Sequence, residues 1–160
     1  SMIDNSKFGC DHICFTTEIN PGAGFKPLNK VASGGELSRF LLAVKLCFLN
    51  KNNKKTQIFD EIDRGVGGAT ASAIGKRLLQ LSKHEQVLVV THSPQVAAYS
   101  DNHLKVEKIN LGNSTKTKVD ILNQEKIVRE IARMLSGELI TSEALAAAET
   151  LRRSSRTEAS

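Results

Sequence analysis

Three short polar motifs in this sequence carry residue types that can act on a phosphate group. The segment Ser33 to Glu36 precedes a long apolar run, Asp60 and Glu61 follow a short β-favouring run, and His92 follows another apolar run. Carboxylates can hold Mg²⁺ and activate water, and the free amides at the start of a helix can bind a phosphate. The three motifs together predict a site for phosphate chemistry.

The glycine pair Gly34 and Gly35 stands where a helix is expected to begin. Ser33 and Glu36 have the S-x-x-E spacing of a capping box, in which each side chain satisfies a backbone amide of the first turn. Capping alone does not explain the glycines, because other residues stabilise a helix better. Bare glycines leave the amides open to a phosphate. On these residues alone, a helix cap and a phosphate site are equally good interpretations.

The acidic pair Asp60 and Glu61 is expected at the carboxyl end of a strand, which is where ligands bind in an open α/β sheet. Adjacent side chains on an extended chain point in different directions, so Asp60 can hold Mg²⁺ while Glu61 orients and deprotonates a water molecule. Thr91 and His92 end a second strand at the same expected edge. A solvated acidic turn and a structural histidine are the commoner roles of such residues taken singly; their combination favours a site.

The elements expected to position these motifs alternate between strands and helices, which predicts an α/β fold with a mostly parallel sheet flanked by helices, followed by a C-terminal hairpin and helices. We expect the helix at 36–49 to be mostly buried and the strand at 86–92 to be covered on both faces. The expected strands are 11–19, 56–61, 86–92, 103–110 and 114–122, and the expected helices are 36–49, 69–81 and 125–135, with Gly137 at the end of the last. A short helix should begin at Pro94. A final helix, capped by Thr141 or Ser142, is expected to fray from Arg152 onwards.

The composition is that of one compact domain spanning residues 1–160. The chain has 160 residues, 40% of them hydrophobic, and a formal charge of +5, which permits weak attraction to phosphates. No apolar run reaches about 18 residues and no signal peptide is seen, so a soluble, cytoplasmic protein with no membrane contact is expected. Ser1 and Met2 have the pattern of a cloning remnant and a start methionine. Cys10, His12 and Cys14 alternate along a strand, and ordinary sheet positions explain them better than a metal site.

The sequence contains no G-x-x-x-x-G-K-[S/T] loop of the kind that wraps the phosphates of a nucleotide. The segment from Gly75 to Arg77 has a glycine and a lysine, but it lies inside an expected helix and lacks the other motif residues. The chain is therefore expected to contain only part of a nucleotide site.

The order of the motifs, Ser33 to Glu36, then Asp60 to Asp63, then His92, resembles the carboxyl-terminal lobe of an ABC-type ATPase head. The resemblance is closest to RecN, a family of bacterial DNA repair proteins related to the SMC proteins, and it covers about Phe15 to Leu151. The segments that carry it are "PLNKVASGGELSR", "IFDEIDRGVGG", "VLVVTHSPQVAA" and "EIARMLSG". Arg64 departs from the family pattern, which has a smaller or apolar residue there.

The resemblance implies a role for each motif in binding and hydrolysing ATP. Ser33 to Glu36 would be the signature that contacts the γ-phosphate of an ATP held by the opposing subunit. Asp60 would support Mg²⁺, and Glu61 would be the catalytic base. Asp63 would belong to the D-loop that communicates across the dimer, and His92 would be the switch histidine that reaches the γ-phosphate.

The resemblance also implies partners and a biological role. The phosphate-wrapping loop would lie in an amino-terminal head lobe, separated from this lobe by a long coiled coil, and both are absent here. ATP would be sandwiched between the heads of a homodimer that acts on DNA in double-strand break repair and recombination, in the cytoplasm at the nucleoid. This chain alone should be inactive. The alternatives are a head lobe of another SMC-like or Rad50-like ATPase, and a non-enzymatic dimerisation or DNA-binding module.

Overall fold

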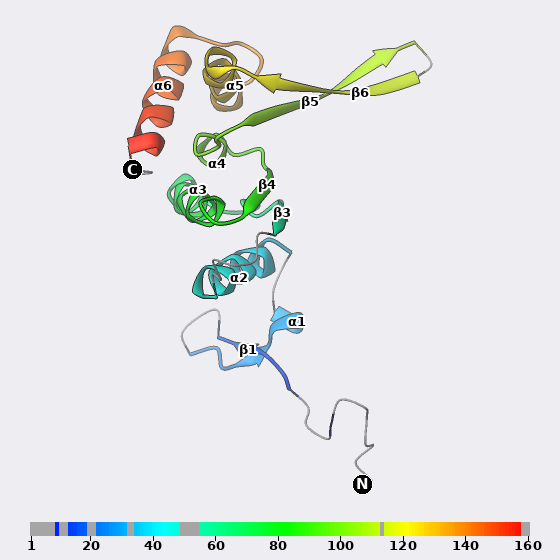
Figure 1. Cartoon of the computed structure of the whole chain (residues 1–160), viewed down its shortest axis with the longest axis vertical. Helices are drawn as coiled ribbons and strands as arrows, with labels where there is room; N and C mark the ends of the chain where they lie inside the picture. The colour runs from blue at the N-terminus through cyan, green and yellow to red at the C-terminus, as the bar shows by residue number, and fades with distance from the viewer. Residues whose placement is uncertain are drawn as a thin grey trace.

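The computed structural model of the chain describes residues 9, 13–18, 22–31, 34–48, 55–112 and 114–157. Its strands are Thr16–Thr17 (β1), Lys26–Pro27 (β2), Thr56–Asp60 (β3), Gln86–Val90 (β4), His103–Leu111 (β5) and Ser114–Leu122 (β6). Its helices are Leu28–Val31 (α1), Gly34–Cys47 (α2), Gly68–Ser82 (α3), Pro94–Ala97 (α4), Gln124–Ser136 (α5) and Ser142–Thr157 (α6). The elements follow one another along the long axis of an elongated molecule, from β1 near one end to α6 near the other (Figure 1).

The strands of the described residues form three two-stranded sheets. β3 and β4 run parallel, with Thr56 opposite Gln86 and Asp60 opposite Val90, so the carboxyl ends of both strands lie at one edge. The pairs β1–β2 and β5–β6 are antiparallel. The α/β class is confirmed, and in the described part of the chain parallel pairing is confined to β3 and β4.

The first core lies between α2, β3, α3 and α4. The strands alternate, so that Phe59 of β3 is 5% exposed and packs inward, whereas its neighbour Ile58 is 71% exposed. Helix α3 supplies half of the buried apolar side chains of this core, because its apolar positions recur at helical spacing. The buried members of this core are Leu42, Phe59, Ile62, Ala71, Ile74, Leu78, Leu81 and Val96. This core holds α2 and the β3–β4 pair against α3.

Two sequence-based expectations about burial are wrong for this part of the structure. Helix α2 is not mostly buried: only Gly35 and Leu42 of the helix are buried, and Phe48 just after it is 79% exposed. Strand β4 is covered on one face only, since Val90 is 61% exposed. The reason is that α2 packs against α3 along one side, and none of the described residues covers its opposite side or the outer face of the strands (Figure 1).

The second core joins α4, α5 and α6 through Ile127, Ile131 and a group of alanines. The sequence predicted that the last helix frays from Arg152 onwards. This prediction is wrong, because α6 continues to Thr157. The guanidinium of Arg152 is buried and donates hydrogen bonds of 2.6 Å to the carbonyl oxygens of Ala98 and Ser100. This contact between distant segments stabilises the last turns of the helix.

The locally patterned elements were predicted well. The helix expected at 69–81 is α3, the hairpin is β5–β6, and α5 ends at Gly137 with a φ of +82°. The amide of Ala144 donates to the side-chain oxygen of Thr141, so Thr141 rather than Ser142 caps α6. The segment from Gly75 to Arg77 lies inside α3, as expected.

Two expectations for the amino-terminal segment, the strand at 11–19 and the alternating Cys10, His12 and Cys14, fall partly outside the described residues. Of the strand expected at 11–19, only Thr16–Thr17 forms β1, and both ends of the expected range lie outside the described residues, as do Cys10 and His12. Cys14 is exposed and has a free thiol. Among the described residues, no cluster of three or more histidine, cysteine, aspartate or glutamate side chains could hold a metal ion by itself, and no helix is long and apolar enough to cross a bilayer.

The packing of α3 on the segment after α4 depends on Gly75. A Cβ at this position would stand 3.0 Å from Cε2 of the buried Tyr99 ring, and closer still to Cδ2. We expect Gly75→Ala to destabilise the protein by about 1–3 kcal/mol, because overpacking forces the ring or the helix to move. Thermal or chemical unfolding measures the change.

Gly34→Ala is the matched control, since Gly34 is also helical and a Cβ there would meet nothing within 4 Å among the described residues. The control should be neutral or stabilising. Equal stability of the two variants would contradict the predicted clash.

Candidate functional site

The acidic pair lies at the carboxyl edge of the parallel strands, as predicted. Asp60 is the last residue of β3, and both Asp60 and Glu61 are exposed. Glu61 has a φ of +50° and is the only non-glycine residue with a positive φ in the described part of the chain. Such a backbone is uncommon outside glycine and is maintained only where the surroundings enforce it. The strand end thus presents two carboxylates to solvent on a constrained turn.

Arg64 pairs with the expected base. Its guanidinium Nη1 lies 2.8 Å from the Glu61 carboxylate, and its amide donates to the Glu61 carbonyl at 3.0 Å. The two side chains are 71% and 55% exposed, so the ion pair contributes no more than about 1 kcal/mol. The residue that departs from the family pattern therefore contacts the carboxylate expected to do the chemistry, through an interaction that is easily broken.

Asp63 ties the turn after β3 to the end of β4. It is only 4% exposed, and its Oδ2 accepts hydrogen bonds from the Thr91 hydroxyl at 2.6 Å and from the Ser93 amide at 3.1 Å. Burying a carboxylate costs free energy unless it is hydrogen-bonded, and these two donors supply the hydrogen bonds. Its other oxygen, Oδ1, is buried without a hydrogen-bond partner among the described residues. Asp63 therefore fixes the relative positions of two strand ends.

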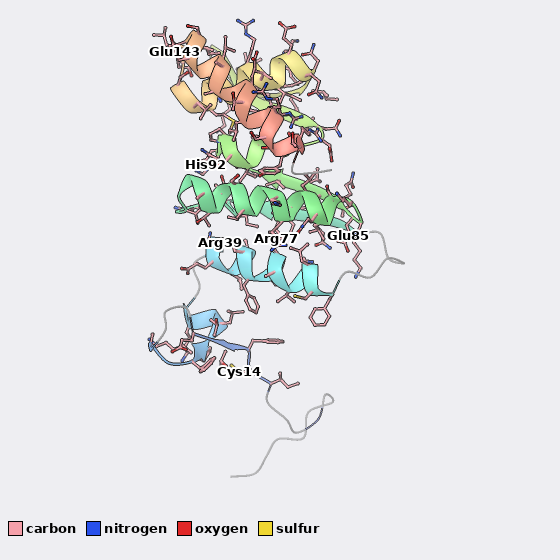
Figure 2. All side chains as sticks on the ribbon, turned by 90° about the vertical axis from the view of Figure 1, so that its left-hand side faces the viewer. Cys14, Arg39, Arg77, Glu85, His92 and Glu143 are labelled. Atoms are coloured by element: carbon pink, nitrogen blue, oxygen red, sulfur yellow. The ribbon has the colours of Figure 1, made fainter. Side chains whose placement is uncertain are left out.

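His92 lies between the two donors that bind Asp63. It is exposed, and it directly precedes Ser93, whose side chain accepts a hydrogen bond from the Val96 amide and caps α4. Figure 2 shows His92 and Arg39 at the same end of the stacked helices α2 and α3, with Glu85 at the opposite end. The histidine therefore lies at the same end of the parallel strands as Asp60 and Glu61.

The start of α2 packs against the same turn. Gly35 is buried, and a Cβ there would stand 3.0 Å from Nη1 of Arg39 and 3.4 Å from the carbonyl oxygens of Glu61 and Arg64. Gly34 is exposed, and nothing among the described residues lies near the position of its missing side chain. Close packing thus explains Gly35, whereas Gly34 leaves open space. Ser33 lies outside the described residues, so the capping box is not visible, and Glu36 is half-buried within the first turn of α2.

Arg39 is the residue of this region that the sequence reasoning missed. Its Nη1 donates to the carbonyl oxygens of Ile62 at 3.1 Å and Arg64 at 3.4 Å. The signal that could have found it is its position one helical turn after Gly35, which places both on the same side of α2. The three predicted motifs therefore meet through the turn at residues 61–64, with α2 on one side and the end of β4 on the other.

Comparison with known proteins places the chain among DNA repair proteins. The chain is 49% identical over 144 residues to the DNA repair protein RecN of Rickettsia bellii, a match that covers 90% of this chain and 26% of that protein. It is 47% identical over 148 residues to the DNA repair protein RecN of Streptomyces coelicolor, covering 92% of this chain and 26% of the relative. The chain belongs to the RecN family. It spans about a quarter of the length of these RecN relatives. No family model matches the chain.

The fold of this RecN segment is that of an SMC ATPase head lobe. A solved structure described as "Structural biochemistry of ATP-driven dimerization and DNA stimulated activation of SMC ATPases" superposes with a TM-score of 0.51 at 20% identity. The match covers 74% of this chain and 70% of the other. It supports the α/β ATPase-head fold predicted from the sequence.

A second cluster of charges in this RecN lobe lies away from the predicted motifs, where α5 packs against the β5–β6 hairpin. Burial by itself raises the pKa of Glu130, but hydrogen bonds from Arg133 and Lys105 hold the pKa below its usual value. Burial lowers the pKa of the nearby His103. The cluster lines a hollow of about 350 Å³ whose walls carry five basic and three acidic side chains. Three of the basic side chains, those of Lys105, Lys118 and Arg133, are in ion pairs with these acidic groups.

The hydrogen bond from Thr91 to Asp63 provides a test of how the turn after β3 is held to the end of β4. We expect Thr91→Val to destabilise the protein by about 1–2 kcal/mol, because it removes the hydroxyl that donates to a buried carboxylate. Thr91→Ser keeps the donor and should lose much less. Unfolding in urea measures both, and equal losses in the two variants would show that the hydroxyl is not the stabilising group.

Proposed function

We propose that this chain supplies one half of a composite ATPase site in a RecN-type DNA repair ATPase. The observation that carries the proposal is the arrangement around the turn at 61–64. It joins the start of α2 and the end of β4, and it presents Asp60 and Glu61 to solvent at the edge between them. A nucleotide at this edge would meet carboxylates for a metal and a base, and helix amides for a phosphate.

The roles follow from the chemistry of each residue. Asp60 would hold Mg²⁺, which favours one or two carboxylates together with phosphate oxygens and water. Glu61 would accept a proton from the attacking water, and His92 would contact the γ-phosphate. The amides from Ser33 to Glu36 would bind the γ-phosphate of an ATP held by the opposing subunit, with Asp63 holding the turn that forms part of the dimer contact. Arg64 would have to release Glu61 first, and an exposed ion pair permits this at low cost.

The remainder of the site is proposed to come from the amino-terminal head lobe of the same protein. Two uncovered apolar surfaces support this: the outer face of the parallel strands, with Ile58, Leu88 and Val90, and the side of α2 that carries Leu41 and Phe48. Exposed apolar surfaces of this extent are typical of contacts with another part of the protein. The RecN relatives are long enough to supply such a lobe, since this chain spans only 26% of their length.

The proposed assembly is a homodimer of heads with ATP between them, acting on DNA at the nucleoid in the cytoplasm. The structural relative is described in terms of ATP-driven dimerization and DNA-stimulated activation, and the sequence relatives are described as DNA repair proteins. These descriptions support ATP, a second head and DNA as partners of the full-length protein. Double-strand break repair and recombination would be the setting of its activity.

The first test removes the proposed base. In the full-length protein, Glu61→Gln should lower the kcat for ATP hydrolysis by about 10²- to 10⁴-fold, because an amide cannot accept the proton from water. ATP binding should persist, since the substitution leaves the metal and phosphate contacts in place. Phosphate release and nucleotide-binding assays measure the two effects.

Glu143→Gln is the control, because Glu143 lies in the first turn of α6, near one end of the molecule, while Arg39 lies near its middle (Figure 2). It should hydrolyse ATP at the parent rate. Strong ATPase activity from this 160-residue chain alone, or an unchanged kcat in Glu61→Gln, would contradict the proposed half-site.

The second test asks whether Ser33 acts on the partner's nucleotide. Ser33→Arg in the full-length protein should abolish ATPase activity while leaving the heads folded, whereas loss of a simple helix cap would cost only about 1 kcal/mol of stability. Mixing this variant with one that lacks the phosphate-wrapping loop should restore activity, because mixed dimers retain one intact composite site. Absence of rescue in verified mixed dimers would count against a contact in trans.

A further inference from the structure

Arg39 makes a contact that the family assignment does not explain. It lies in α2, one turn after the glycine pair, and reaches across to the turn that follows β3. Its Nη1 donates to the carbonyl oxygens of Ile62 and Arg64, the two residues that flank Asp63. Ile62 directly follows Glu61. One guanidinium group therefore holds the backbone on both sides of the residue that anchors the turn.

The turn is packed into the core through Ile62, which is 0% exposed, but its backbone conformation at Glu61 is unusual. Glu61 has a positive φ, and the Glu61 and Arg64 side chains are both mainly exposed, so packing does not fix them. Hydrogen bonds from a charged donor are stronger than those between neutral groups. Asp63 secures the turn to β4 on one side, and Arg39 secures it to α2 on the other.

The guanidinium lies close to the backbone at Gly35, where a side chain would crowd it. A Cβ at Gly35 would approach Nη1 of Arg39 to 3.0 Å, and would crowd the carbonyl oxygens of Glu61 and Arg64 at 3.4 Å. Gly35 and Arg39 therefore form one packing unit against the turn.

We propose that Arg39 is a positioning residue that holds Glu61 at the nucleotide site by fixing the turn at residues 61–64. The inference rests on the proposed function, in which Glu61 is the base. Arg39 itself touches only backbone carbonyls of the turn among the contacts seen here, so it acts through Glu61 rather than on the nucleotide.

The test uses the full-length protein and a double-mutant cycle. Arg39→Met should lower the kcat for ATP by about 100-fold, the cost of misplacing a catalytic group, with the KM for ATP changed by less than about twofold. Arg39→Lys keeps a charged donor and should recover part of the rate. In a Glu61→Gln background, Arg39→Met should change the residual rate by less than about twofold, since residues that act as a unit are not additive.

Arg77→Met is the matched control. Arg77 lies on the adjacent helix α3, and its guanidinium donates a hydrogen bond of 2.9 Å to the side chain of Gln80 on the same helix. It should retain the parent kcat in both backgrounds. A parent-like kcat in Arg39→Met, or an equal loss with and without Glu61, would overturn the proposal. If Arg39→Met fails to fold, Arg39→Lys carries the same comparison.

Hydrogen exchange separates this inference from the proposed function. In the full-length protein, Arg39→Met should speed exchange of the backbone amides at 62–65, while Arg77→Met should not. If the parent lacks ATPase activity, or if Glu61→Gln leaves it unchanged, the proposed function fails and the exchange data still test the contact. Unchanged exchange at 62–65 in Arg39→Met would overturn the inference whatever the activity.

Discussion

The geometry of the candidate site depends on the buried carboxylate of Asp63. A charge removed from water must be hydrogen-bonded, and here the donors are the Thr91 hydroxyl and the Ser93 amide at the end of the neighbouring strand. This requirement joins two strand ends whose residues are far apart in the sequence. The acidic pair lies just before Asp63 in the chain, and His92 lies just after Thr91. The hydrogen bond between Thr91 and Asp63 therefore brings them to one edge.

The start of α2 meets the same turn from the other side, and the two glycines there have different explanations. Gly35 is buried against the turn, where a side chain would crowd Arg39 and two carbonyl oxygens. Gly34 is exposed and leaves its surroundings open, as a phosphate site at a helix start requires. Packing at Gly35 therefore leaves Gly34 open for the proposed phosphate contact.

The two ends of the molecule differ in how completely they are covered. Around α5 and α6, the apolar side chains form a closed core, and Arg152 satisfies carbonyl oxygens of a distant segment. Around α2 and the parallel strands, large apolar side chains such as Ile58 and Phe48 remain exposed. The exposed apolar side chains lie on or next to α2 and β3, the same elements that carry the candidate site, which suits the proposal that another lobe completes it.

The sequence by itself determined the features that depend on local pattern. Helical spacing predicted α3 and α5, and the carboxyl ends of two apolar runs correctly placed Asp60 and His92 at one edge of a parallel pair. It did not predict the exposure of α2 or the full length of α6. It also missed Arg39, whose acceptor Ile62 is 23 residues away in the sequence. Tertiary structure decided these features, because burial and side-chain hydrogen bonds depend on which distant segments pack together. The local spacing of residues does not determine that packing.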